Sequence, residues 1–212
     1  MPSRSQQTSF RKGFSRLDGA VTRAAGMVAP MITTVEIKGD RNEKVRVSES
    51  LVRQMYDLLG TNMTQIVAGA NADWQSDAAF SKWKNEVFLG EVHRHTSHLL
   101  VLDEKGLRGF LSYTAAPDTE DVYLNELQIR ASCRIDGVTL RRLIRMFAVR
   151  IREIPQDHIR TYSNKANTFA HGLAKKTGFT KVGKTDRGYR YRMHKRQFLD
   201  RFLPKGPPKT DR

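Results

Sequence analysis

Residues 123–144 read YLNELQIRASCRIDGVTLRRLI, and this stretch decides the fold. Its first part, Tyr123–Ile129, is apolar apart from Asn125, Glu126 and Gln128, and it is expected to form a β-strand. A polar turn that contains Arg134 and Gly137 follows. Beyond the turn, apolar residues recur at helical spacing, which predicts a helix from Gly137 to about Glu153. The stretch is therefore expected to form a strand, a turn and a long helix.

The turn before this helix has the chemistry of an anion site. The first backbone N–H groups of a helix have no intrahelical acceptor, and the helix dipole adds positive potential at the same end. Gly137 would let a ligand approach the backbone closely. The pattern favours a pyrophosphate there, although many strand–turn–helix units bind no ligand.

The remaining segments predict a mixed sheet around this unit. Strands are expected, beyond 121–129, at 97–113 (a hairpin), 158–163 and 179–196 (a second hairpin), with one or two short strands within 32–47. Helices are expected at 48–60, 77–90 and Asn167–Thr177. This order predicts an α/β (α+β) domain whose mixed central sheet has helices on both faces.

Composition narrows the possible classes of protein. The chain has 212 residues, of which 39% are hydrophobic, so it can bury one substantial core. Its single cysteine, Cys133, excludes a disulfide framework and a cysteine zinc site, and we expect no metal. No apolar run approaches the roughly 20 residues of a membrane span. A reducing compartment is the simplest interpretation, so we expect a cytoplasmic protein, or a nuclear one, without membrane contact.

The termini are predicted to be tails. Residues 1–30 are basic and rich in serine and threonine, which suits a disordered arm or an organelle transit peptide, and the arm is preferred. Residues 31–198 are expected to form the domain and 199–212 a second disordered basic tail. The whole net charge of +15 lies in residues 140–212, which hold 20 basic and 5 acidic residues. Such a region attracts nucleic acid, the ribosome or a phosphorylated cofactor, or it is simply a solvated surface.

Two motifs resemble the GCN5-related N-acetyltransferase (GNAT) superfamily across roughly residues 48–196. The family's Gln/Arg-x-x-Gly-x-Gly/Ala loop grips the pyrophosphate of acetyl-CoA, and this chain has Arg134-Ile135-Asp136-Gly137-Val138-Thr139. Thr139 departs from the motif, and Asp136 places a negative charge beside a polyanion. We expect Arg134, Arg141 and Arg142 to offset that charge.

The second motif is Asn-x-x-Ala-x-x-x-Tyr-x-x-x-Gly-Phe, matched by Asn167, Ala170, Gly178 and Phe179. The resemblance implies that Asn167 binds the pantetheine arm and that the backbone of Leu127 and Ile129 binds the thioester. The motif's tyrosine, the usual general acid, is replaced by Ala174. Tyr191 is the preferred substitute, and Tyr189 and His171 are the other candidates.

The predicted strand carries a carboxylate, Glu126, that could remove the proton from an attacking amine. A surface-facing glutamate is the alternative interpretation. The strand sequence Tyr123-Leu-Asn125-Glu126-Leu-Gln128 is also similar to N-alpha-terminal acetyltransferases of the histone-tail-modifying type. That similarity implies a peptide site lined by Trp74, Tyr123, Asn125 and Glu126.

Three functions remain open from the sequence. The first is acetyl transfer from acetyl-CoA to a primary amine, expected on a protein or peptide as an N-terminal or lysine amine. The second is an acetyltransferase whose acceptor is associated with nucleic acid, such as charged tRNA or a ribosomal protein, which the basic region favours. The third is a nucleic-acid-binding module that kept this fold and lost catalysis, which Asp136, Thr139 and Ala174 favour.

Overall fold

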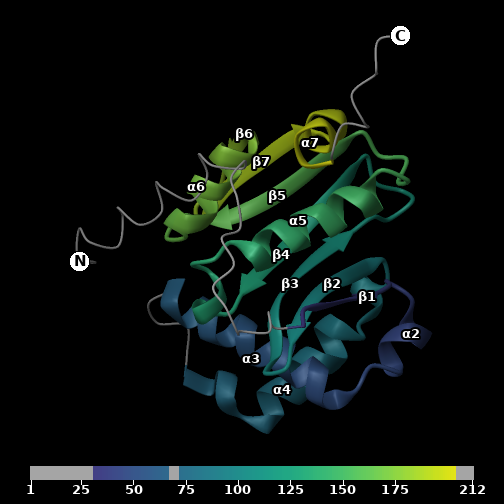
Figure 1. Cartoon of the computed structure of the whole chain (residues 1–212), viewed down its shortest axis with the longest axis vertical. Helices are drawn as coiled ribbons and strands as arrows, with labels where there is room; N and C mark the ends of the chain where they lie inside the picture. Colours follow the sequence, from purple (N-terminus) through teal and green to yellow (C-terminus); the bar gives the residue numbers. More distant parts are fainter. Residues whose placement is uncertain (1–30, 67–71, 204–212) are drawn as a thin grey trace, which may run out of the picture.

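The computed structural model describes residues 31–66 and 72–203, which fold around a seven-stranded sheet (Figure 1). The strand order is β1-β2-β3-β4-β5-β7-β6, and the pairing is antiparallel except between β4 and β5. The strands are β1 (Thr33–Ile37), β2 (Thr96–Asp103), β3 (Gly106–Thr114), β4 (Asp121–Ile129), β5 (His158–Asn164), β6 (Thr180–Lys184) and β7 (Gly188–His194). The prediction of a mixed sheet with helices on both faces is confirmed.

Helices cover the two faces of the sheet unequally. One face packs against α5 (Val138–Ile151), α6 (Thr168–Thr177) and α7 (Lys195–Phe202), which share a core with residues of β2, β3, β4, β5 and β7. The other face packs against α3 (Glu49–Ile66) and α4 (Asp77–Trp83), and α3 lies against β3 and β4. Figure 1 shows α5 crossing the middle of the sheet, with α6 and α7 near β5 to β7.

Two predicted elements near the beginning of the fold differ from the observed ones. Residues 41–45 form the short helix α2 rather than a strand, because the Asp40 side chain accepts from the Asn42 N–H and starts a helical turn. Helix α3 does not end at Gly60 as expected. Trp74 covers Gly60, and a Cβ there would lie 3.1 Å from the indole, so this glycine provides space for packing.

The predicted helix at 77–90 changes its type part-way. It is α-helical only as far as Trp83, and Lys84–Phe88 form a π-helical turn. The C-terminal boundary also differs from the expected one. Helix α7 continues to Phe202, and Leu199, Phe202 and Leu203 pack against the core, so residues 199–203 belong to the domain. The two tails, 1–30 and 204–212, lie outside the described residues. None of the helices described here is long and apolar enough to cross a membrane.

Candidate functional site

The parallel strands β4 and β5 separate part-way along their length. They pair only from Asp121 with His158 to Leu124 with Thr161, and beyond that point they diverge. A β-bulge at Asn125 bends β4 at the same place, since Leu124 and Glu126 pair with successive residues of β3. A cavity of about 280 Å³ lies at the divergence, lined by both strands and by residues of α3, α5 and α6.

Glu126 lines this cavity and is half-buried. Burial raises the pKa of its carboxyl, and the hydrogen bond that Gln128 Nε2 donates to Oε2 (2.7 Å) opposes that rise only in part. The predicted alternative of a surface-facing glutamate does not hold. A carboxylate with a raised pKa at the edge of a cavity has the properties of a general base.

A buried chain of hydrogen bonds joins Glu126 to the loop before α5. Gln128 Oε1 accepts from Asn62 Nδ2 at 2.8 Å, and Asn62 Oδ1 accepts from Arg134 Nη2. Arg134 Nε also donates to the Ile129 carbonyl at 3.1 Å. Sequence reasoning missed Asn62 because only the tertiary fold brings α3 against the end of β4. Arg134 therefore ties the loop to the strand that carries the candidate base.

The start of α5 has the geometry expected of an anion site. Gly137 occupies the N-cap position with φ of 63°, a left-handed conformation that favours glycine. Asp136 Oδ1 accepts from the Val138 N–H at 2.8 Å. The N–H groups of Thr139 and Leu140 follow in the same first turn, where no intrahelical carbonyl can accept from them. Ile135 is 88% exposed at the tip of this loop.

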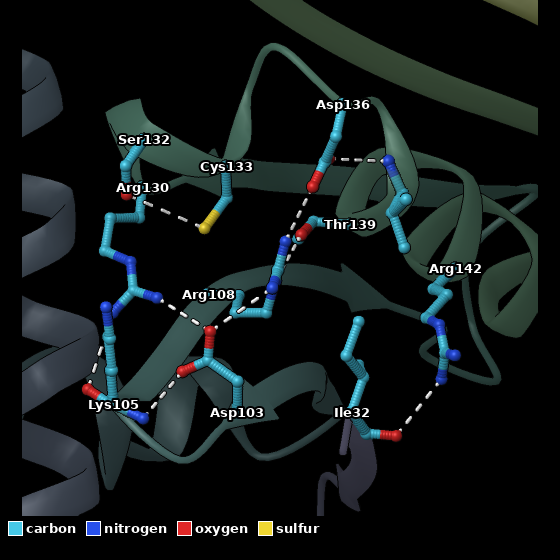
Figure 2. Close-up of polar contacts among 11 residues, drawn as sticks. Ile32, Asp103, Lys105, Arg108, Arg130, Ser132, Cys133, Asp136, Thr139 and Arg142 are labelled. Carbon is cyan, nitrogen blue, oxygen red and sulfur yellow. Dashed lines mark hydrogen bonds and ion pairs between the residues drawn. The ribbon is translucent and has the colours of Figure 1, made fainter. Parts of the chain in front are cut away.

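Arg108 of β3, which the sequence analysis did not single out, neutralises the negative charge of Asp136. Figure 2 shows Arg108 of β3 between two carboxylates. Its Nη1 lies 3.2 Å from Asp103 Oδ2 and its Nη2 lies 2.9 Å from Asp136 Oδ2, while its Nε donates to Thr139 Oγ1 at 3.0 Å. Two of the arginines that were expected to offset the charge of Asp136 do not contact its carboxylate. Arg141 reaches only the backbone carbonyl of Asp136, and Arg142 donates to the Ile32 carbonyl.

Thr139 points into the protein and does not occupy the loop surface. Its side chain is fully buried, and its Cγ2 approaches β3 where Gly109 has no side chain. A Cβ on Gly109 would lie 3.0 Å from that methyl group and 2.6 Å from the Gln128 carbonyl oxygen. The departure from the family's small residue is therefore accommodated by a glycine on the neighbouring strand.

Leu127 and Ile129 present backbone groups on the edge of β4 that faces the divergence. The Ile129 carbonyl bonds to Arg134 and Asn62 rather than to β3, and residues two apart on a strand direct their backbone groups to the same edge. Strand β5 does not pair with this part of β4. The Leu127 amide therefore lies on the edge of β4 that lines the cavity, so a role as an oxyanion donor stays a prediction.

Asn167 has a structural task that the sequence analysis did not assign to it. Its Oδ1 accepts from the Ala170 N–H at 2.9 Å and caps α6, which ends at Gly178 with φ of 89°. Helix capping explains this asparagine without a ligand. Asn167 also lines the cavity, so a role in ligand binding stays a prediction.

Tyr191 and Ala174 line the same cavity. The Tyr191 hydroxyl lies 2.9 Å from His171 Nδ1, and His171 Nε2 lies 3.2 Å from the Lys165 carbonyl. Because that carbonyl can only accept, we assign the imidazole proton to Nε2, and the hydroxyl then donates to Nδ1. Burial, with a smaller contribution from Tyr189, raises the pKa of Tyr191, which keeps its proton on the oxygen at neutral pH.

We expect Tyr191→Phe to lower kcat by about tenfold without a matching change in KM. This is less than the roughly 100-fold that a general acid contributes, because a thiolate leaves more easily than an alkoxide. Steady-state kinetics with acetyl-CoA would measure the effect. An unchanged kcat together with a lower melting temperature would assign Tyr191 to packing alone.

The structure separates the predicted peptide-binding residues. Tyr123 and Asn125 line a second cavity next to the first. Trp74 does not join them. Its ring packs on Tyr56, 5.4 Å between centroids, in the apolar layer between α3 and α4, and it lines neither cavity.

Comparison with known proteins identifies the fold. No protein-family model and no curated protein matches the sequence. Among solved structures, a GNAT-family acetyltransferase of Staphylococcus aureus superposes with a TM-score of 0.55 at 12% identity, covering 77% of this chain and 99% of its own. An acetyltransferase of Streptococcus agalactiae gives 0.57 at 15%, covering 77% and 98%. The PaiA N-acetyltransferase of Thermoplasma acidophilum, solved in complex with coenzyme A, gives 0.54 at 14%, covering 76% and 99%.

These matches cover nearly the whole length of each solved structure, and identities this low establish the fold alone. The chain has the GNAT fold. The cavity at the divergence of β4 and β5 is connected to the loop before α5 by the hydrogen bonds of Asn62 and Arg134.

Proposed function

We propose that this protein transfers the acetyl group of acetyl-CoA to a primary amine of a protein or peptide. The observation that carries the proposal is the cavity at the β4–β5 divergence. A carboxylate with a raised pKa and an unpaired strand edge lie at this cavity, and hydrogen bonds through Gln128, Asn62 and Arg134 connect them to the loop before α5. One match, PaiA, was solved with coenzyme A, which supports the same cosubstrate here.

The proposed chemistry assigns one task to each group. The start of α5 binds the pyrophosphate, and the cavity between the strands holds the pantetheine arm and the thioester. Glu126 removes a proton from the amine, whose nitrogen attacks the thioester carbonyl. The Leu127 amide stabilises the oxyanion, the C–S bond breaks, and the nitrogen releases its second proton to solvent. Tyr191 turns its hydroxyl from His171 Nδ1 and protonates the departing thiolate.

Titration calorimetry with acetyl-CoA tests the cosubstrate directly. We expect saturable binding, weakened at least tenfold by Arg134→Gln, since the change removes a cation from the loop and its tie to β4. Arg145→Gln, an exposed arginine of α5, is the control with the same loss of charge and should bind as the wild type does. Wild-type protein that binds no acetyl-CoA at millimolar concentration would exclude the enzyme in favour of a binding module.

A further inference from the structure

The sheet face that carries α3 and α4 is open over β5 and β7. Ile159, Tyr191 and Met193 of these strands face the core, so the residues that alternate with them face the opposite side. These are Arg160 and Tyr162 of β5, paired in register with Arg192 and Arg190 of β7. Tyr162 is 48% exposed and Arg190 is exposed, so none of the helices within residues 31–66 and 72–203 covers this part of the sheet.

A second cavity on this open face adjoins the candidate catalytic cavity. Tyr123, Arg160 and Arg190 line it. It shares four lining residues with the first cavity, and these lie on both sides of the strand divergence: Leu124, Asn125, Thr161 and Tyr162. A molecule in the second cavity therefore reaches the point where β4 and β5 separate, beside Glu126.

The second cavity carries excess positive charge. Asp121 is buried between two guanidiniums, with Oδ2 2.7 Å from Arg160 Nη2 and Oδ1 2.9 Å from Arg192 Nε. One carboxylate thus serves two arginines, and the Arg160 side chain is 34% exposed, with Nη1 donating to the Tyr123 hydroxyl at 3.4 Å. Arg190 makes no ion pair in the part of the chain that the structure describes. These groups would attract an anionic segment of a ligand.

We propose that the acceptor is a peptide amine followed closely by acidic side chains, which Arg190 and Arg160 bind. The proposal rests on the proposed acetyltransfer and specifies its substrate. Arg190 lies two strands from β4, and strands are about 4.8 Å apart, so the distance across the sheet is roughly 10 Å. An extended peptide spans about 3.4 Å per residue. A carboxylate two or three residues beyond the amine therefore reaches the arginines.

A peptide fits this surface better than a polynucleotide. A neighbouring groove on the far side of Tyr123 and Asn125 is lined by Glu91, Arg94 and Asp118, and Arg94 neutralises Glu91 at 3.0 Å. The exposed Asp118 would repel a continuous phosphate backbone, whereas a short peptide can place a few acidic residues on the arginines alone. The acceptor amine, which is a cation until it loses its proton, can approach from this more acidic side.

The test compares two short peptides that differ only in asparagine or aspartate at positions two to four, with release of free coenzyme A as the readout. We expect kcat/KM to be about fivefold higher for the acidic peptide, the upper range for one exposed ion pair, and the preference to shrink as salt is added. Arg190→Gln should remove most of the preference. Arg196→Gln, which removes an exposed arginine of α7 away from this face, should keep it.

Each outcome that contradicts these expectations would overturn a different part of the proposal. Equal rates for both peptides would overturn the acidic acceptor and leave acetyl transfer standing. Acetyl-CoA binding without acetylation of either peptide would overturn the peptide acceptor, here and in the proposed function, and would leave the cosubstrate standing. Loss of acetyl-CoA binding would overturn the whole proposed function. Inhibition by a short single-stranded RNA that Arg190→Gln relieves, without a preference for the acidic peptide, would assign the surface to nucleic acid instead.

Discussion

Glu126→Gln is expected to lower kcat about 100-fold at pH 7, because an amide cannot take the proton from the attacking amine. The substitution keeps the shape of the side chain and an oxygen that can still accept from Gln128 Nε2. The deficit should shrink as pH rises, since more of the amine is then already deprotonated in solution. Release of coenzyme A, followed between neutral and alkaline pH, measures both effects.

The raised pKa of Glu126 gives this test a second readout, the pH dependence of kcat. A base works only when it is deprotonated, so wild-type kcat should fall as pH drops through a value above the ordinary 4.5, and the variant should lack that fall. A raised pKa in the folded state means that folding disfavours the charged form, so this group lowers stability above its unfolded pKa. Glu126→Gln should therefore melt no lower than the wild type at pH 7.

The exposed Glu120 provides a matched control. Glu120→Gln removes the same charge shortly before β4 and should leave kcat unchanged. A Glu126→Gln variant with wild-type kcat at pH 7 would remove Glu126 from the mechanism and return it to a structural role.

The sequence predicted those parts of the fold that depend on short-range patterns. The mostly apolar run at 121–129, the glycines at 137 and 178 and the apolar stripe of α5 each act within a few residues, so their elements appear where expected. The second strand that was considered after Gly39 does not form, and the reason is local as well. The Asp40 side chain caps the short helix α2, and this outweighs the weak alternation of the residues that follow. The prediction that Gly60 ends α3 was wrong because this glycine makes room for Trp74, which comes from another element.

The candidate site was predicted less completely, because its polar groups pair across long stretches of sequence. Glu126 and the loop before α5 follow from local motifs. Their partners do not, since Asn62 lies on α3 and Arg108 on β3. An arginine between a leucine and a glycine in a strand gives no sign that its guanidinium will lie under a helix N-terminus. The charge of Asp136 could therefore be judged only from its position in the sequence, where it looked unfavourable for anion binding.

Arg108→Met is expected to destabilise the fold by about 3 kcal/mol, because it leaves two carboxylates without their shared cation. Most of the expected loss of stability comes from Asp103, because its side chain is only 9% exposed. Burial disfavours its charge, but the Lys105 amide, Arg130 and Arg108 together hold the pKa of that carboxyl below its usual range. For a domain of this size the loss corresponds to a fall of roughly 10 °C in melting temperature.

The pH dependence of that loss identifies its source. A depressed pKa in the folded state contributes stability above the unfolded pKa, and this stability disappears as pH falls through the folded value. The difference between wild type and Arg108→Met should therefore narrow below about pH 4. Arg142→Met removes an exposed arginine of α5 whose described contact is one backbone carbonyl, and it should cost little. A stability difference between wild type and Arg108→Met that stayed constant at acid pH would attribute the loss of stability to packing.

The same substitution should weaken acetyl-CoA binding at least tenfold, for a reason separate from stability. Without Arg108, the charge of Asp136 faces the pyrophosphate beside the first turn of α5. Asp136→Asn in the Arg108→Met background removes that charge while an amide oxygen can still accept from the Val138 N–H. We expect this double variant to recover most of the affinity but little of the melting temperature. If affinity does not recover, Arg108 acts on the cosubstrate through the position of the loop rather than by neutralising Asp136.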